Sequence, residues 1–254
     1  MNTETAAVSV SDEGGVRFIT FDRPAKLNAL TIAELREVAR LLTAEPLRAA
    51  VFTGSGPKAF SAGMHIQSFR DMDVDSAREL ISAVRDFVGA VRTAPYPTIA
   101  AVNGYCLGAA FELALACDVR ISVRSAGFGL PEVKVGIPSV VDASLLQQHV
   151  GLSLAKEMIL TGDVYPAEEM WRLGLLNLIV EPGELDGAVR AMLPRLTAHT
   201  PAVIAAQKRL FETWQNTSLS EGIEASVEEF AQMFADPSTR AQVEAHFAAV
   251  TGGK

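Results

Sequence analysis

The sequence contains very few cysteines and no long uninterrupted hydrophobic segment. Its two cysteines, Cys106 and Cys117, lie in one apolar stretch, which is typical of reduced thiols in a cytoplasmic protein. The longest apolar region, residues 98–123, is broken by polar residues and glycines, so no run reaches the roughly 20 residues needed to span a bilayer. The first ten residues lack the basic segment and apolar run of a secretory leader. The sequence therefore predicts a cytoplasmic protein without a membrane segment.

Basic residues are also in short supply. The chain carries 22 Lys and Arg against 30 Asp and Glu, which gives a formal net charge of −8. A field of this sign argues against a general nucleic-acid-binding protein. The densest basic spot is the pair Lys208 and Arg209, which is too small to support RNA binding. An anionic substrate must therefore be held by a local arrangement of hydrogen-bond donors.

Side chains that bind metals are sparse as well. The histidines and cysteines show none of the spacings typical of metal sites, so the sequence predicts no metal centre. The four histidines are His65, His149, His199 and His246.

The residues that are present divide the chain into two parts. With 49% hydrophobic residues, the chain has enough apolar material for a sizeable core. Periodicity and turn residues predict strands at residues 6–10, 16–21, 49–52, 98–102 and 119–123, and helices at 32–42, 76–92 and 111–117. Beyond about residue 153 the patterns are almost entirely helical, with further helices opening near Thr200, Ser220 and Pro237. These patterns predict an α/β core followed by a helical region.

Three segments combine glycines, small residues and acids. The first is K-A-F-S-A-G-M-H-I at residues 58–66, a small-residue loop after a strand. The second is A-A-V-N-G-Y-C-L-G-A-A-F-E-L at residues 100–113, where a strand enters a glycine turn and a helix begins near Gly108. The third is F-G-L-P-E-V-K-V-G-I-P at residues 128–138, which places Glu132 in an apolar stretch bounded by glycine and proline.

The start of the helix after Gly108 offers an anion site made from backbone alone. The first N–H groups of a helix have no intrahelical partner and carry the positive end of its dipole, so they can bind an oxyanion. Glu112 lies three residues after Ala109, on the same helical face. Because its neighbours are apolar, its carboxylate is expected to be paired or functional. Glu132 taken alone is also consistent with an ordinary turn residue.

Together these segments resemble the enoyl-CoA hydratase/isomerase (crotonase) family. The similarity covers about residues 23–180 and includes T-G-D at 161–163 and G-L-L-N-L-I-V at 174–180. The Asn-Gly and Pro-Glu segments form a specific signal in combination, whereas either alone is weak. The resemblance implies an α/β fold, with a crotonase-like spiral of repeated ββα units at residues 1–195. It also implies a C-terminal helical oligomerisation region at 196–254 that builds trimers, often paired into hexamers.

The resemblance also implies roles for individual residues. The backbone N–H groups of Met64 and Ala109 would form the oxyanion hole for the thioester carbonyl of an acyl-CoA. Glu112 and Glu132, 20 residues apart (132 − 112), match the two carboxylates of the hydratases. Glu112 would deprotonate the attacking water and Glu132 would protonate the α-carbon. The implied enzyme is an enoyl-CoA hydratase, a hydro-lyase of fatty acid metabolism, and it needs no cofactor because coenzyme A is part of the substrate.

Further positions follow from the same resemblance. His65 stands where hydratases usually have Asp, and a residue that caps or packs the loop is favoured over a catalytic His. Asp142 is open between a third carboxylate near the site and a helix cap. Phe111 and residues 137–142 depart from the usual pattern and are candidates for selecting the acyl group. The implied substrate-binding residues are Lys26, Leu27, Ala62, Met64, His65, Ile66 and Gly108.

Two other functions stay open. A double-bond isomerase of the same family needs only one carboxylate, so retention of both Glu112 and Glu132 favours hydration, although other members with two acids run different chemistry. The second alternative is a catalytically inactive binding protein of the same fold.

Overall fold

The computed structural model describes residues 8–44 and 46–251. Its strands are β1 (Val8–Glu13), β2 (Val16–Phe21), β3 (Ala49–Gly54), β4 (Ala59–Ser61), β5 (Thr98–Val102), β6 (Tyr105–Leu107), β7 (Val119–Val123), β8 (Gly127–Gly129), β9 (Tyr165–Pro166) and β10 (Leu178–Val180). Its α-helices are α1 (Ile32–Thr43), α2 (Val74–Arg92), α3 (Ala109–Ala116), α4 (Leu146–Val150), α5 (Leu152–Thr161), α6 (Ala167–Arg172), α7 (Leu185–Thr197), α8 (Pro201–Asn216), α9 (Leu219–Met233) and α10 (Pro237–Thr251). Short 3-10 helices are η1 (Pro24–Lys26), η2 (Ile66–Phe69), η3 (Pro131–Val135), η4 (Val141–Leu145) and η5 (Pro182–Glu184).

The predicted strands and helices of the N-terminal part are present. β1 and β2 pair antiparallel, and Gly14 and Gly15 between them have φ of +59° and +82°, as a tight two-residue hairpin turn requires. Positions 6 and 7 of the first predicted strand lie outside the described residues, as do most of the ten residues on which the prediction of no targeting segment rests. The helix predicted at 111–117 begins two residues earlier, at Ala109, directly after Gly108.

The strands form two sheets that are built by alternation along the chain. The six-stranded sheet has the order β1-β2-β3-β5-β7-β10, and the four-stranded sheet has the order β4-β6-β8-β9. After the first unit, whose strands β1 and β2 both belong to the larger sheet, a unit gives one strand to the larger sheet and the next strand to the smaller one, and a helix follows. β3, β4 and α2 make one such unit, and β5, β6 and α3 make the next. This repetition is the predicted spiral of ββα units.

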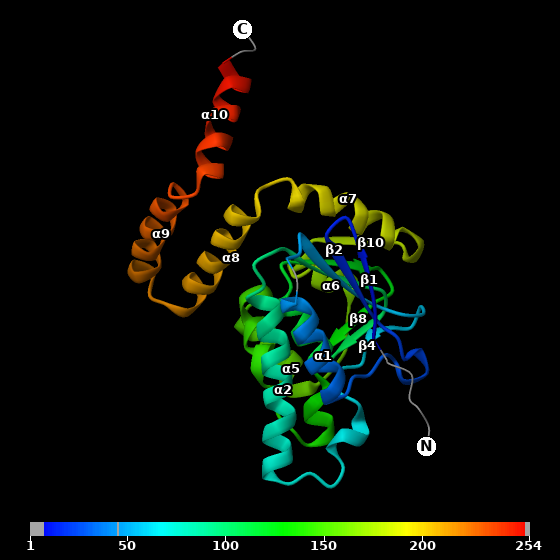
Figure 1. Ribbon diagram of the computed structural model, residues 1–254. Coiled ribbons are helices and arrows are strands. Elements are labelled where there is room, and N and C mark those ends of the chain that lie inside the picture. Colours follow the sequence, from blue (N-terminus) through cyan, green and yellow to red (C-terminus); the bar gives the residue numbers. More distant parts are fainter. Residues whose placement is uncertain (1–7, 45, 252–254) are drawn as a thin grey trace.

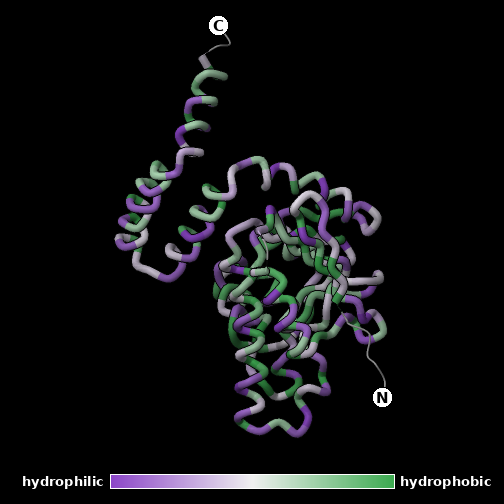
Figure 2. The backbone as a smooth tube through the Cα atoms, in the orientation of Figure 1, coloured by the Kyte–Doolittle hydropathy of each residue, from purple (hydrophilic) through white to green (hydrophobic). Residues whose placement is uncertain are grey.

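The core lies between the larger sheet and the helices that cover it. Strands β5 and β7 are buried along their whole length, as expected for central parallel strands with both faces covered. Helices α1 and α2 pack side by side (Figure 1). Figure 2 shows hydrophobic residues gathered inside this part of the molecule. Every residue of α3 is buried, so the acid that α3 carries is surrounded by core.

A buried arginine holds the C-terminal end of α3. Arg120 on β7 donates through Nη1 to the carbonyl oxygens of Ala114 (3.1 Å) and Cys117 (2.5 Å), and through Nε to that of Leu175 (2.7 Å). The last carbonyls of a helix have no intrahelical donors, and a cation there also interacts favourably with the negative end of the helix dipole. Arg120 therefore fixes α3 at the end opposite to its ligand-facing N-terminus.

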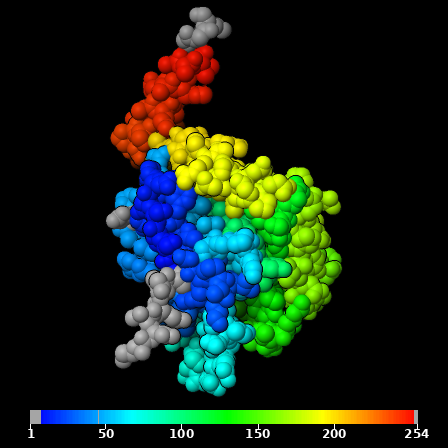
Figure 3. Space-filling model, turned by 90° about the vertical axis from the view of Figure 1, so that its right-hand side faces the viewer, coloured from blue at the N-terminus to red at the C-terminus, as the bar shows by residue number. Residues whose placement is uncertain are grey.

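The last helices project away from the packed body. α7 still packs against β7, β5 and β3, so the predicted boundary between residues 195 and 196 falls inside α7. α8 and α9 pack on each other, and α9 and α10 extend beyond the rest of the molecule (Figures 1 and 3). Among the described residues, no helix is both long and apolar enough to cross a membrane.

Candidate active site

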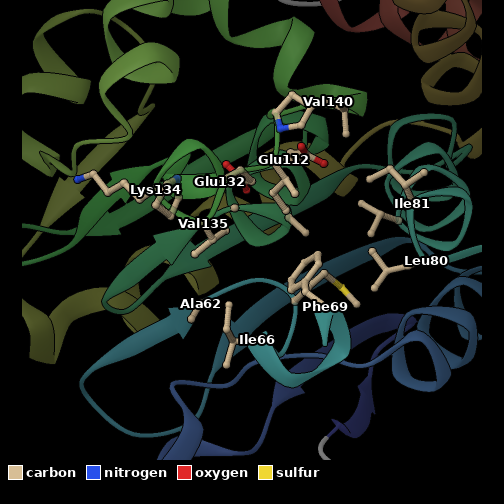
Figure 4. A pocket seen from close by; sticks show the side chains of 17 residues that line it. Ala62, Ile66, Phe69, Leu80, Ile81, Glu112, Glu132, Lys134, Val135 and Val140 are labelled. Atoms are coloured by element: carbon tan, nitrogen blue, oxygen red, sulfur yellow. The ribbon is translucent and has the colours of Figure 1, made fainter. Parts of the chain in front are cut away.

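One cavity collects parts of all three segments that the sequence singled out. Its walls come from the loop after β4, from α2, from the start of α3 and from the stretch that contains η3. The lining residues are Ala62, Met64, Ile66, Phe69, Leu80, Ile81, Val84, Gly108, Ala109, Glu112, Pro131, Glu132, Lys134, Val135, Ile137, Pro138 and Val140. Figure 4 shows Glu112 and Glu132 near each other in this cavity, with Leu80 and Ile81 to one side.

Gly63 brings the proposed oxyanion donors together. Gly63 has φ of +79°, and a Cβ on it would lie 2.7 Å from the carbonyl oxygen of Leu107 and 2.9 Å from the backbone nitrogen of Ala109. Only a residue without a side chain allows the two backbones to approach this closely. The chain before Met64 therefore lies directly against the start of α3.

Among the described residues, neither the N–H of Met64 nor that of Ala109 takes part in the backbone hydrogen bonds around it. Leu30 forms a parallel bridge with Met64, in which the N–H of Leu30 donates to Gly63 and the N–H of His65 donates to Leu30. In such a bridge the N–H of the central residue points away from the partner. Ala109 is the first residue of α3, and its N–H has no intrahelical acceptor. Their assignment to an oxyanion hole stays a prediction.

Glu112 is a buried acid with an unsatisfied oxygen. Its N–H donates to the carbonyl oxygen of Gly108 (3.0 Å), which places it in the first turn of α3. The residue is 3% exposed, and within the described part of the chain its Oε2 has no hydrogen-bond partner. Buried polar atoms nearly always have a partner, so an exception needs an explanation. Because Glu112 lines the cavity, a water molecule or substrate in that cavity is the natural partner.

Glu132 approaches the same point from η3. Its Oε2 accepts a hydrogen bond from the Ser139 hydroxyl at 2.7 Å. Its Oε1 lies 2.7 Å from where a Cβ on Gly108 would be. Gly108 itself has φ of +56° and ψ of −133°, a conformation that essentially only glycine adopts. This glycine therefore gives Glu132 access to the N-terminus of α3.

The two acids differ in their surroundings. Burial, and then the negative charges of Glu132 and Asp142, raise the pKa of Glu112 to about 9. Burial also raises the pKa of Glu132, but the hydrogen bond from Ser139 opposes that shift. Two carboxylates in one poorly solvated site cannot both ionise cheaply, so they titrate as a coupled pair. In the ligand-free cavity near neutral pH, the shared proton therefore favours Glu112.

Asp142 belongs to the surroundings of this pair. It is 8% exposed, and its Oδ2 accepts a hydrogen bond from Nε of Arg92 at 3.2 Å. Its side chain caps no helix, and its charge contributes to the raised pKa of Glu112. Of the two roles left open, the structure therefore supports a third carboxylate near the site.

The remaining predicted positions fall in two groups. Ala62, Ile66 and Gly108 line the cavity. His65 caps η2, and its Nδ1 accepts from the N–H of Gln67 at 3.3 Å, which agrees with a local structural role. Lys26 and Leu27 are not among the lining residues, but the carbonyl oxygen of Leu27 accepts a hydrogen bond from the N–H of Ala62, which does line the cavity. A role of these residues in binding CoA stays a prediction.

One expectation about the acyl pocket is wrong. Phe111 does not line the cavity. It is fully buried and packs edge-on against Phe128, with ring centroids 5.5 Å apart. A helix turns by 100° per residue, so Phe111 faces the core while its neighbour Glu112 faces the cavity. Of the candidate segment at 137–142, Ile137, Pro138 and Val140 do line the cavity.

Sequence reasoning missed the apolar wall and the polar neighbours of the acids. Leu80, Ile81 and Val84 follow the helical spacing of α2, which predicts a core face equally well. Ser139 and Arg92 stand in no recognisable motif, and only their contacts reveal their proximity to the site. No signal in a single sequence would have identified them.

Comparison with known proteins decides the family. The family model for enoyl-CoA hydratase/isomerase matches residues 11–248. The chain belongs to this family. A short-chain-enoyl-CoA hydratase from Clostridium acetobutylicum is 31% identical, over 89% of both proteins. A carnitinyl-CoA dehydratase from Escherichia coli is 34% identical, over 85% of this chain and 84% of that protein.

Solved structures agree with the family and confirm the predicted fold. An enoyl-CoA hydratase from Mycobacterium smegmatis superimposes with a TM-score of 0.90 at 30% identity, over 96% of each chain. The protein is thus an α/β crotonase-like enzyme of the kind that acts on acyl-CoA thioesters, with a helical C-terminal region.

Proposed function

We propose that this enzyme adds water across the double bond of a trans-2-enoyl-CoA to give a 3-hydroxyacyl-CoA. The observation that carries the proposal is the presence of two carboxylates, Glu112 and Glu132, in one cavity at the N-terminus of α3. Hydratases and a dehydratase among the relatives support the same reaction class. The proposed reaction needs no metal or redox cofactor, since coenzyme A enters as part of the substrate.

The positions of the two acids suggest which carbon each one serves. A thioester carbonyl bound to the N–H groups of Met64 and Ala109 would place the α-carbon beside Gly108, where Oε1 of Glu132 lies. The β-carbon is one bond further away, toward Glu112 in the next part of the helical turn. Glu132 would therefore give its proton to the α-carbon, and Glu112 would take a proton from the water that attacks the β-carbon.

This assignment balances the protons. The water contributes its hydroxyl to the β-carbon and one proton to Glu112, while Glu132 loses the proton that forms the new α C–H bond. One net proton moves from Glu132 to Glu112, and it must return to Glu132 before the next hydration. Each positioned acid or base is worth roughly 10²–10⁴ in rate, and each oxyanion donor about 3–4 kcal/mol.

The apolar end of the cavity favours the binding of an uncharged acyl group. Phe69, Leu80, Ile81, Val84 and Val140 form this wall. A charged acyl terminus placed against them would lose its hydration without gaining a partner. We propose that the enzyme prefers aliphatic enoyl groups, as expected for a role in fatty acid metabolism.

The C-terminal helices support an oligomer. They expose a continuous series of large apolar side chains, which monomeric proteins seldom leave in water. We propose a homotrimer or a pair of trimers in which a second copy covers this surface. The exposed residues are Phe211, Trp214, Leu219, Ile223, Val227, Phe230, Phe234, Val243, Phe247 and Val250.

Cys106 and Cys117 are buried free thiols, which supports the cytoplasm as the proposed location.

The test follows the conjugated enoyl-thioester absorbance when purified enzyme meets crotonyl-CoA or a longer trans-2-enoyl-CoA. Rapid loss of absorbance in the wild type, slowed at least about a hundredfold in Glu112→Ala and in Glu132→Gln, is expected. Glu79→Gln on the surface of α2, where the side chain is 57% exposed, serves as the matched control and should react like the wild type. Equal rates for Glu132→Gln and wild type would refute the two-acid mechanism. Conversion of a 3-enoyl-CoA without hydration would identify an isomerase instead.

A further inference from the structure

The segment of residues 139–142 contacts the surroundings of both active-site acids. At its start, the Ser139 hydroxyl donates to Oε2 of Glu132 at 2.7 Å. At its end, Asp142 is buried in η4, which packs against α3, the helix that carries Glu112. Between them, Val140 lines the cavity. One short stretch of chain therefore provides a separate neighbour for each acid.

An unusual backbone conformation separates these two neighbours. Val141 has φ of +52°, a left-handed value that a β-branched residue adopts only at a cost of about 1–3 kcal/mol. The packing of η4 against α2 and α3 must offset this cost. The turn at Val141 carries the chain from the Ser139 side of the site to the buried position of Asp142.

The charge of Asp142 is only partly compensated. Its cationic partner Arg92 also donates to Oε2 of Glu212 on α8, at 2.6 Å. One guanidinium therefore serves two carboxylates, Asp142 at 3.2 Å and Glu212 at the shorter distance. Arg92, Asp142 and Glu212 together therefore carry a net negative charge. An additional negative charge disfavours the anionic form of Glu112, whereas the Ser139 hydrogen bond favours the anionic form of Glu132.

The buried cation Arg120 lies at the opposite, C-terminal end of α3, where it donates to backbone carbonyl oxygens. The charged groups of the other packed elements are paired or face solvent. On α2, the remaining ions form surface pairs, namely Arg36 with Glu79, Arg78 with Asp75, and Arg85 with Asp86.

On η3, Lys134 pairs with Asp163 at 2.8 Å. Helix α5, which packs on η3, presents Lys156 and Glu157 to solvent. Strand β5 carries no titratable residue, and β6 has the exposed Tyr105 and the buried thiol of Cys106.

We propose that residues 139–142 add to the deeper burial of Glu112 and so favour the shared proton on Glu112 over Glu132. Ser139 stabilises Glu132 as the anion through its hydroxyl, and the negative charge of Asp142 adds to the burial that favours the protonated form of Glu112. Ser139 and Asp142 are thus positioning residues that act through the two acids. Their role rests on the proposed hydration, in which the proton must pass between Glu132 and Glu112 in each turnover. The ligand-free enzyme is then held in the state that follows hydration, with the proton on Glu112.

Infrared titration of the ligand-free protein tests this assignment directly. Labelling all glutamates with ¹³C at the carboxyl carbon separates their protonated C=O band from that of aspartates, and Glu112→Gln and Glu132→Gln assign it to one residue. At pH 7 the wild-type band should vanish in Glu112→Gln and persist in Glu132→Gln. In Asp142→Asn, which has nearly the same shape, the midpoint for Glu112 should fall by about one pH unit or more.

Titration of the Ser139 variants tests the proposal independently of the Asp142 variant. Ser139→Ala should raise the midpoint for Glu132 by about one pH unit, and Ser139→Thr, which keeps the hydroxyl, should restore it. Ser139 is only half-buried, so this titration gives a result even if Asp142→Asn does not fold. Asp86→Asn removes an equal charge at the surface of α2 and should leave both midpoints unchanged.

Failure of this inference is distinguishable from failure of the proposed function. Unchanged midpoints in Asp142→Asn and Ser139→Ala would overturn the role of residues 139–142, even in an enzyme that hydrates enoyl-CoA. Shifted midpoints in a protein that hydrates no enoyl-CoA would leave the proton assignment standing and refute the hydratase reaction.

Discussion

Gly108 and Glu132 are in such close contact that any side chain at position 108 would displace the carboxylate of Glu132. A Cβ at position 108 would lie 2.7 Å from Oε1 of Glu132, well inside the distance that a carbon and an oxygen tolerate. Gly108 is also the N-cap of α3, immediately before Ala109. Both the start of α3 and the position of Glu132 therefore require glycine at position 108.

Gly108→Ala should lower kcat/KM at least about a hundredfold while the protein stays folded, because displacement of a catalytic group by about 1 Å has an effect of this size. The measurement is enoyl-thioester hydration together with a circular dichroism melting curve. Gly89→Ala in α2 is the matched control, since a Cβ there would meet nothing within 4 Å. A Gly108→Ala enzyme with wild-type kcat/KM would contradict the importance of this contact.

Glu112→Gln should make the protein relatively more stable as the pH rises. The pKa of Glu112 is raised to about 9 in the folded protein from 4.5, so only the unfolded chain ionises between these values. Folding stability of the wild type therefore decreases from pH 4.5 toward pH 9, by up to about 3 kcal/mol at pH 7. Gln does not titrate, so this decrease disappears in the variant.

Urea denaturation at several pH values measures this difference. The gap in unfolding free energy between Glu112→Gln and wild type should widen with pH in favour of the variant. Glu79→Gln at the surface should follow the wild-type curve. A gap that stays constant from pH 5 to pH 8 would show that Glu112 titrates normally.

Ile81→Phe should shorten the preferred acyl chain. Ile81 is half-buried and lines the apolar end of the cavity, so added bulk there competes with the far end of a long acyl group but not with a crotonyl group. The ratio of kcat/KM for the longer enoyl-CoA to that for crotonyl-CoA should fall about tenfold or more. Ile159→Phe in α5 is the control, because Ile159 packs on the core away from the cavity. Equal ratios in both variants would place the acyl group elsewhere.

Phe230→Asp should reduce the oligomer to smaller species. Phe230 is 68% exposed on α9, and a carboxylate placed in an apolar interface would be desolvated without a partner. Light scattering coupled to gel filtration gives the mass directly. Gln232→Asp adds the same charge at an exposed polar position of α9 and should keep the wild-type mass. A wild-type protein that is already monomeric at micromolar concentration would refute the proposed trimer.

The sequence by itself determined the elements, the family and the two acids. Strand and helix patterns depend on local periodicity and turn residues, and this is why the Gly14 and Gly15 hairpin and α2 were predictable. Glu112 was identifiable because a carboxylate within a run of apolar residues is locally anomalous. The likeness to known sequences supplied the remaining identification, including the ββα spiral that no single segment encodes.

Only the tertiary structure decided what surrounds those acids. Turns at Gly136 and Val141 carry Ser139 and Asp142 toward the site. Arg92 bonds to Asp142, 50 residues away in the chain, and to Glu212, 120 residues away. Phe111 was misplaced because one residue along a helix changes the face by 100°, which sequence spacing near a helix start does not resolve. Local pattern specifies which groups are present. Long-range packing specifies their distances and their burial, and in this site both differ between the two acids.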